Sequence, residues 1–109
     1  MTEKRMHRVY AYVWEYRVDP AWRDRFAAAY GADGVWADFF GQSEGYLRTD
    51  LHCDAVDADR FLTIDYFEHP SCRADLVAAQ AERFDRIDRE WEQATLSETK
   101  IGEFWVETA

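Results

Sequence analysis

Cysteine is scarce in this sequence, and its two copies, Cys53 and Cys72, stand in neither a C-x-x-C motif nor any other spacing typical of a metal site. Disulfide staples are not needed either, because 48% of the residues are hydrophobic and can supply a core of their own. We therefore expect two reduced thiols and a cytoplasmic protein.

Positive charge is also in short supply, since 22 acidic residues face 13 lysines and arginines and the formal net charge is −9. Such a surface repels phosphate backbones and anionic lipids, so we expect no nucleic acid and no membrane among the partners. No apolar run is long enough to span a bilayer, and the charged segment 1–7 lacks the apolar stretch of a signal peptide. Linkers and low-complexity tracts are missing too, and the length suits one domain over residues 1–109.

Aromatic residues, in contrast, are abundant, because five Trp, six Tyr and seven Phe make up 17% of the chain. Many of them stand in segment 9–18, whose β-branched and aromatic composition predicts a strand that ends at Asp19-Pro20. Both faces of its first half are apolar, which indicates a strand covered on both sides. The larger side chains share one face, namely Tyr10, Tyr12, Trp14 and Tyr16.

Two helical segments follow this strand. Asp19 is a good N-cap and Pro20 suits a first helical turn, and aromatic residues recur every four positions, which together predict a helix over residues 20–30. The glycines of segment 31–34 break this helix, and a second helical piece follows over residues 35–40. The buried stripe of the first helix consists of Trp22, Phe26 and Tyr30.

The second half of the chain repeats the order of strand, helix and strand. Alternation over residues 46–55 and a β-rich run over residues 60–68 predict an antiparallel hairpin, with the first of these strands at a sheet edge. A long helix runs from Ser71, its expected cap, to about residue 94, and residues 101–107 form the last strand. This helix buries a stripe made of Val77, Ala81, Phe84, Ile87 and Trp91.

The order strand, helix, strand, strand, helix, strand predicts an α+β domain of the ferredoxin-like βαββαβ type. Its four-stranded antiparallel sheet carries both helices on one face. The other face is then bare and exposes more contiguous apolar surface than a monomer usually tolerates. A second copy packed against it with two-fold symmetry would bury this surface, so we expect a homodimer. The bare face carries Val9, Ala11, Val13, Leu62, Ile64 and Tyr66.

Three stretches carry a resemblance to a known family. Residues 15–20, the Gly45-Tyr46-Leu47 entry to the second strand and residues 60–68 resemble, in order and spacing, the landmarks of the antibiotic biosynthesis monooxygenase superfamily, the dimeric α/β barrels. The likeness covers residues 8–106 and implies the same fold, a dimer, and a pocket between the helices and the sheet. It does not carry over one reaction, because the superfamily includes cofactor-free oxygenases of aromatic polyketides, heme-degrading enzymes and members without known activity.

The heme-degrading branch of this superfamily is not implied. That branch uses an Asn on the first strand, a Trp at the end of the third strand and a His on the second long helix. Here Tyr16 and Phe67 stand at the first two places, and no His occurs between Ser71 and Thr95. We therefore expect no heme-degrading enzyme, and the oxygenase considered below would need no heme, metal or flavin cofactor.

The same correspondence places Phe67 toward the helices, and strand alternation then places Thr63 and Asp65 on the same side. In a cofactor-free oxygenation the substrate supplies the electrons, and the protein needs a base to form the substrate anion and donors to hold it. Asp65 is the candidate base, because burial among apolar groups raises the pKa of a carboxyl, and the phenol of Tyr16 is a second candidate catalytic group. A ring-lined wall suits a small, flat aromatic molecule. The residues expected to bind it are Tyr12, Trp14, Trp36, Thr63 and Phe67.

Two of the candidate residues have open alternatives. Trp36 follows the glycines of segment 31–34 and is a candidate gate at the pocket mouth, or simply a core residue behind a helix break. His52, flanked by Asp50 and Asp54, is a third candidate catalytic residue as a proton shuttle, or a residue of the dimer interior, or a solvated surface residue. These three side chains also have the look of metal ligands, but one strand offers them poor convergence, so we expect no metal site.

Our first functional hypothesis is a homodimeric, cofactor-independent monooxygenase that acts on an aromatic or polyketide-like small molecule. The alternative is a non-redox protein of the same barrel type, either a polyketide cyclase or a small-molecule binding protein. A third interpretation is a structural dimer without a cavity, in which Phe26, Phe84 and Trp91 fill the space behind the first strand.

Overall fold

The computed structural model describes residues 8–107; segment 1–7, which the sequence predicts to be no signal peptide, lies outside the described residues. The strands and helices alternate along the chain. Their order is β1 (Val9–Val18), η1 (Pro20–Trp22), α1 (Arg23–Tyr30), α2 (Val35–Phe40), β2 (Tyr46–Cys53), β3 (Arg60–Phe67), α3 (Pro70–Ala79), α4 (Ala81–Trp91), η2 (Glu92–Ala94) and β4 (Thr95–Val106).

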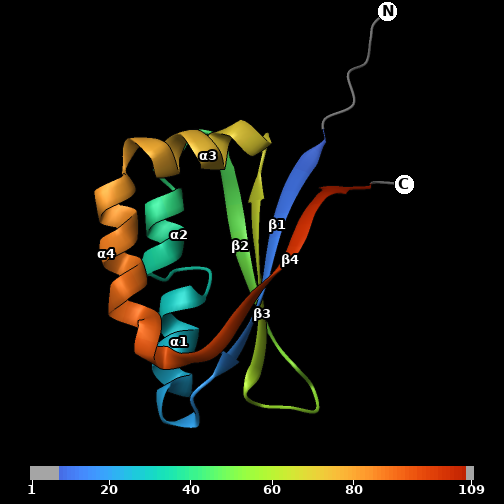
Figure 1. Ribbon diagram of the computed structural model, residues 1–109. Helices are drawn as coiled ribbons and strands as arrows, with labels where there is room; N and C mark the ends of the chain where they lie inside the picture. Colours follow the sequence, from blue (N-terminus) through green and yellow to red (C-terminus); the bar gives the residue numbers. More distant parts are fainter. Residues whose placement is uncertain (1–7, 108–109) are drawn as a thin grey trace, which may run out of the picture.

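The strands form one antiparallel sheet in the order β2-β3-β1-β4. Strand β1 lies inside the sheet, where it pairs with β3 on one side and β4 on the other, and β2 is an edge strand, as predicted. Figure 1 shows the helices on one face of this sheet and the opposite face uncovered. The ferredoxin-like α+β fold predicted from the sequence is thereby confirmed.

The core lies between the sheet and the helices and consists largely of aromatic rings. Phe26 of α1 stacks on Tyr30 with 4.1 Å between ring centroids, and it contacts Phe61 of β3 at 5.1 Å. Phe39 of α2 and Phe67 of β3 are completely buried. Because such ring pairs add about 0.5–1.5 kcal/mol each to the effect of area burial, this cluster accounts for part of the aromatic excess in the sequence.

The chain turns sharply between α1 and α2. The side chain of Asp19 accepts a hydrogen bond from the backbone N–H of Ala21 at 2.9 Å and so caps the helical region at its start. At the other end of α1 the backbone of Gly34 folds back against that of Ala29, and a Cβ atom at Gly34 would lie only 2.1 Å from the Ala29 carbonyl oxygen. Glycine is therefore required there, and the resulting turn places α2 alongside the sheet.

The second helical region differs from its prediction in two ways. The cap is His69 and not Ser71, since the Nδ1 atom of His69 accepts from the Ser71 N–H at 3.2 Å. Pro70 prefers the first helical position, which leaves the residue before it as the cap. The helix also breaks at Gln80, whose φ of −121° and ψ of 37° separate α3 from α4. Within residues 8–107 no helix is long and apolar enough to cross a membrane.

Strand β4 begins at Thr95, six positions before the predicted start at Ile101. Its first half is polar and exposed and pairs with β1 through backbone hydrogen bonds, so no alternation of apolar residues marks it in the sequence. A register shift opposite Val13 and Trp14 separates this half from the apolar end of the strand. The early start extends β4 past the middle of β1, which is where the site described below lies.

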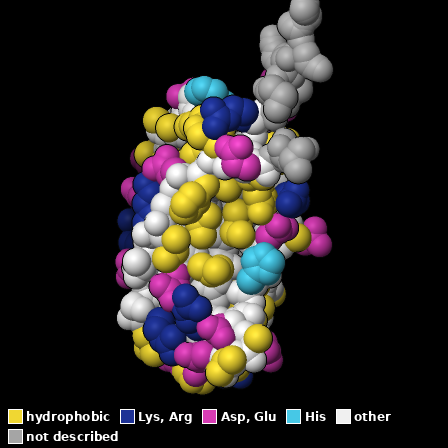
Figure 2. Space-filling view, turned by 90° about the vertical axis from the view of Figure 1, so that its right-hand side faces the viewer, with side chains coloured by type: hydrophobic (Ala, Val, Ile, Leu, Met, Phe, Trp, Pro, Cys, Tyr) yellow, Lys and Arg dark blue, Asp and Glu magenta, His cyan; other side chains and the backbone are white. Residues whose placement is uncertain are grey.

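The uncovered face of the sheet is apolar at its centre (Figure 2). The strand registers place Val13 opposite Ile64, and Ala11 opposite both Tyr66 and Phe104. The ring of Phe104 lies over Gly102 and is still 49% exposed. We call this surface the open face. Its apolar residues are Val9, Ala11, Val13, Leu62, Ile64, Tyr66, Phe104 and Val106.

Candidate functional site

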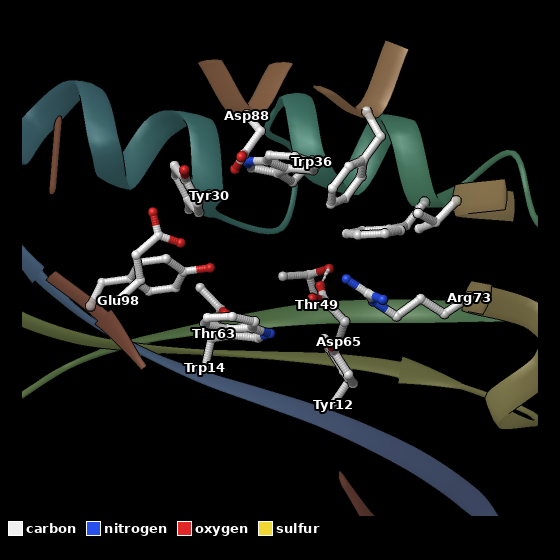
Figure 3. A pocket seen from close by; sticks show the side chains of 14 residues that line it. Tyr12, Trp14, Tyr30, Trp36, Thr49, Thr63, Asp65, Arg73, Asp88 and Glu98 are labelled. Atoms are coloured by element: carbon white, nitrogen blue, oxygen red, sulfur yellow. Dashed lines mark hydrogen bonds between the residues drawn. The ribbon is translucent and has the colours of Figure 1, made fainter. Parts of the chain in front are cut away.

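A cavity of about 370 Å³ lies between the helical face of the sheet and the helices. This volume falls within the range of small-molecule binding sites, toward its lower end. The core rings therefore leave space behind β1, which contradicts the interpretation as a dimer without a cavity. The residues that line it (Figure 3) are Tyr12, Trp14 and Tyr16 of β1, Tyr30, Trp36 and Phe40 of α1 and α2, Thr49 of β2, Thr63 and Asp65 of β3, Arg73, Val77, Phe84 and Asp88 of α3 and α4, and Glu98 of β4.

Aromatic rings form two facing walls of the cavity. On the sheet side, Trp14 and Tyr16 lie with ring centroids 6.3 Å apart and 26° between their planes. On the helical side, Trp36 stacks on Phe40 at 5.8 Å and contacts Phe84 edge to face at 5.2 Å. Figure 3 shows Trp14 and Trp36 across the cavity from each other. Two such surfaces suit a planar ligand. The burial of Trp36 favours its interpretation as a core residue over that as a gate.

Asp65 is a buried carboxyl whose partners are hydroxyl groups. The Thr49 hydroxyl donates to its Oδ1 atom at 2.6 Å, and the Tyr46 hydroxyl lies 2.8 Å from the same Thr49 oxygen. Since a threonine has one hydroxyl hydrogen, Tyr46 donates to Thr49 and Thr49 to Asp65. Burial raises the pKa of Asp65 to about 6, against the opposing effects of the Thr49 hydrogen bond and the Arg73 charge. The raised pKa agrees with the expectation from the sequence, whereas the role of Asp65 as a base stays a prediction.

We expect the substitution Asp65→Asn to stabilise the protein at pH 8 by up to about 3 kcal/mol and to change its stability little at pH 4. Folding raises the pKa of this carboxyl from 3.8 to about 6, so the native state binds the proton more tightly than the unfolded chain does. Its effect on the free energy of unfolding is therefore absent below about pH 4. The destabilisation grows between about pH 4 and pH 6 and stays constant at higher pH. Asparagine carries no charge and keeps an oxygen for the Thr49 hydroxyl.

Urea denaturation of both proteins at pH 4, 6 and 8 measures this difference. Asp75→Asn is the matched control, because Asp75 is an exposed carboxylate on α3, and its substitution should shift the midpoint little at any of the three pH values. A destabilised Asp65→Asn protein at pH 8, or a difference that does not depend on pH, would contradict the prediction.

Two buried phenols face the cavity from opposite layers. Tyr16 is 8% exposed and Tyr30 7% exposed, and their ring centroids lie 5.2 Å apart. Burial raises the pKa of both phenols well above the ordinary value of 10. They therefore remain protonated at neutral pH and are available as hydrogen-bond donors to a ligand. The placement of Tyr16 agrees with the sequence analysis, which did not single out Tyr30 as a site residue.

Two N–H groups in the cavity lack a hydrogen-bond partner. Among the described residues, three buried side-chain nitrogens are unpaired, and two of them, Trp36 Nε1 and Arg73 Nε, belong to residues that line the cavity. The third is Arg23 Nε, outside the cavity. An unpaired buried donor costs about 1–3 kcal/mol, and a ligand acceptor would remove that cost.

Acidic groups gather at the end of the cavity away from Arg73, where Figure 3 shows Glu98 and Asp88 near Tyr30. Glu98 pairs with Tyr16 on the neighbouring strand, and its pKa is raised by partial burial and by the charge of Asp88. The pKa of Asp88 is also raised, first by burial and then by the charge of Glu92. The cavity thus has a basic end and an acidic end.

Two of the predicted site residues lie elsewhere. Phe67 is completely buried behind the cavity, where its ring packs against Phe40 and Tyr46. His52 pairs with Leu62 on the open face and is exposed, so it does not meet Asp65 in this chain. Alternation along β2 places Cys53, which pairs with Phe61, on the helical face of the sheet and His52 on the opposite face.

The metal alternative for His52 finds no support in the geometry. Asp54 accepts hydrogen bonds from the Val56 and Asp57 N–H groups and from Arg60, so its carboxylate turns into the loop after β2. Within residues 8–107 no three His, Cys, Asp or Glu side chains converge as a metal site would require.

Several cavity residues escaped the sequence analysis, although two of them carried a signal. Arg73 stands four positions before Val77, so it continues the predicted buried stripe of the helix as a charged residue. Thr49 lies on the apolar face of the second strand, between larger residues. Glu98 and Asp88 had no such signal, because the first half of β4 has no alternation of apolar residues and Asp88 lies outside the predicted buried stripe of the helix.

No family model and no curated protein matches this sequence. Solved structures, however, are similar to it over nearly the whole chain, and the fold they share is that of the antibiotic biosynthesis monooxygenases. The fold implied by the resemblance in the sequence is therefore confirmed.

SnoaB, a cofactor-independent oxygenase from Streptomyces nogalater, is 16% identical; the match covers 94% of this chain and 96% of SnoaB with a TM-score of 0.70. A candidate antibiotic biosynthesis monooxygenase from Nitrosomonas europaea is 13% identical over 96% of this chain and 91% of its own, with a TM-score of 0.63. PA3566 from Pseudomonas aeruginosa is 14% identical over 97% and 99% of the two chains, also with a TM-score of 0.63. At such identities the likeness establishes the fold, and the reaction has to be argued from the cavity.

Proposed function

We propose that this chain is a cofactor-independent monooxygenase that acts on a planar aromatic or polyketide-like small molecule. The observation that carries the proposal is Asp65, a buried carboxyl with a pKa of about 6 that borders a cavity walled by aromatic rings. Such a group can take a proton from an acidic C–H or O–H at neutral pH. The similarity in fold to SnoaB, a cofactor-independent oxygenase, supports the same class of reaction.

The proposed reaction uses the side chains as follows. Asp65 removes a proton from an activated CH₂ group of the substrate, while Thr49 holds the carboxyl in place and the protonated phenol of Tyr16 donates to the substrate anion. The anion gives one electron to O₂, and the two radicals combine with formation of a C–O bond. Asp65 returns its proton to the peroxide. Cleavage of the O–O bond with loss of the remaining C–H proton then leaves a ketone and releases water.

The proposal includes association of two copies through the open face. Val13, Ile64 and Tyr66 lie at the centre of an apolar surface that no element within residues 8–107 covers (Figure 2). A two-fold symmetric partner would bury the same residues on both copies, which is the commonest geometry of soluble dimers. The exposed His52 would then lie at or near the interface.

Cys53 and Cys72 are free thiols, which supports a cytoplasmic location.

Oxygen uptake tests the function. Anthrone, a naphthol and a naphthohydroquinone are offered to the purified protein with EDTA present, and uptake is recorded with an oxygen electrode and corrected for autoxidation. We expect one O₂ consumed per ketone formed, and one ¹⁸O atom from ¹⁸O₂ in the product. Absence of uptake across this panel would contradict the oxygenase. Oxygen-independent consumption of a poly-β-ketone would favour the cyclase instead.

A further inference from the structure

The guanidinium of Arg73 is a positive charge at one end of the cavity. It lies over the ring of Tyr12, with 3.8 Å between the guanidinium carbon and the ring centroid, and more distantly over the rings of Phe40 and Phe84. Its buried Nε–H has no hydrogen-bond partner, and among residues 8–107 it forms no ion pair. Arginine stays charged at neutral pH, so this group attracts an anion.

The carboxyls that the Arg73 charge influences already have other partners. Asp65 accepts from Thr49 at 2.6 Å. Glu103 accepts from the Tyr10 hydroxyl at 2.7 Å and from Lys100 at 2.5 Å. Figure 3 shows the guanidinium directed toward Thr49 and Asp65, along the inside of the cavity. The side chain is therefore positioned toward the space that a ligand would occupy.

The opposite end of the cavity has the reverse character. Glu98 and Asp88 present carboxyl oxygens there, with Glu98 near Tyr30 and Asp88 beside Trp36 (Figure 3). These oxygens accept hydrogen bonds and repel an anion. A planar ligand with one acidic end therefore has one favourable orientation between the walls.

We infer that the cavity selects planar aromatic acids: a carboxylate of the ligand binds Arg73, and a hydroxyl at the far end of the ligand donates to Glu98 or Asp88. This inference concerns the same cavity as the proposed function and adds the chemical class and the orientation of the substrate. It does not depend on whether the bound molecule reacts with oxygen.

Three related probes separate the two ends by isothermal titration calorimetry at pH 7.5: 6-hydroxy-2-naphthoate, its neutral amide, and 2-naphthoate. We expect the hydroxy acid to bind at least tenfold more tightly than the amide and at least threefold more tightly than 2-naphthoate. Arg73→Met should reduce the preference for the hydroxy acid over its amide, the first ratio, to below three. It should leave the preference for the hydroxy acid over 2-naphthoate, the second ratio, in place. The double variant Glu98→Leu with Asp88→Leu should abolish the preference for the hydroxy acid over 2-naphthoate and leave the preference for the acid over the amide.

Two further variants serve as controls. Arg83→Met removes an arginine of α4 that lies outside the cavity and pairs with Asp38, so both ratios should persist. Arg73→Lys keeps the positive charge and should keep the preference for the acid, which protects the test against a folding defect of Arg73→Met. Equal binding of acid and amide to the unmodified protein, an unchanged first ratio in Arg73→Met, or no binding of either acid at millimolar concentration would overturn the inference.

The outcome is distinguishable from that of the oxygen-uptake experiment. Selective, Arg73-dependent binding without any oxygen uptake would support the acid-selective cavity and contradict the oxygenase. Oxygen uptake with neutral and acidic substrates at equal kcat/KM would support the oxygenase and contradict the selectivity.

Discussion

Substitution of Asp65 by asparagine is expected to lower kcat/KM for oxygen uptake by a factor of about 10²–10⁴, because the amide cannot accept the substrate proton. The shape of the side chain and the hydrogen bond from Thr49 are kept. In the unmodified protein kcat/KM should rise as the pH increases through about 6, as Asp65 loses its proton, and then level off. The variant should show only a low rate without this rise. An oxygen electrode and a pH series from 5 to 9 measure both.

The control for this experiment is again Asp75→Asn, which removes one negative charge from the same protein at an exposed position of α3. Its kcat/KM should equal that of the unmodified protein at every pH. An Asp65→Asn protein that retains more than about a tenth of the activity would show that another group takes the proton. Together with the stability prediction, the expected result is a protein that is more stable and nearly inactive, which a loss of folding cannot imitate.

The substitution Ile64→Arg is expected to convert a dimer into monomers at micromolar concentration, with the dissociation constant raised at least about 100-fold. Ile64 lies at the centre of the open face, opposite Val13 of β1 and Asp50 of β2. A two-fold axis near this point would bring two arginines together in a dry interface, where desolvation and like charge both oppose association. In the monomer the same side chain would reach water. Sedimentation velocity gives the mass of the particle.

Val56→Arg makes the same change of residue type at a position that is 96% exposed in the loop after β2. It should leave the dimer intact, so a difference between the two variants reports the position and not the added charge. Circular dichroism of Ile64→Arg should retain the native spectrum. If the unmodified protein sediments as a single chain at micromolar concentration, the dimer proposal is wrong. If Ile64→Arg remains a dimer, the interface lies on another surface.

The buried carboxyl ties the proposed chemistry to the stability of the fold. An uncharged residue at position 65 would remove the pH-dependent destabilisation of the folded state. It would also end the proposed proton transfer. The neighbouring hydroxyls of Thr49 and Tyr46 moderate the destabilisation, since a hydrogen bond to the ionised form lowers the pKa of Asp65 against the effect of burial. Functional sites often keep groups that the fold alone would not favour.

Strand alternation predicts the cavity residues of β1 correctly but does not place Phe67 and His52 at the cavity. Alternation along a strand is a local property, so the sequence separates Tyr12, Trp14 and Tyr16 from the opposite face, and the structure brings all three to the cavity. Phe67 also faces the helices, as alternation predicts, but the rings of Phe40 and Tyr46 pack against it and it does not line the cavity. His52 follows the alternation as well, toward the open face.

The sequence by itself determined the βαββαβ order and which residues of a strand share a face, because periodicity, caps and turn residues act over a few positions of the chain. That the face of Asp65 points inward was implied by the resemblance to the family. Only the tertiary structure decided that a cavity remains and that it has a basic and an acidic end. The break at Gln80 and the early start of β4 bring Arg73 and Glu98 to the same cavity. Both depend on packing and backbone pairing between distant segments, which leave no local pattern in the residues themselves.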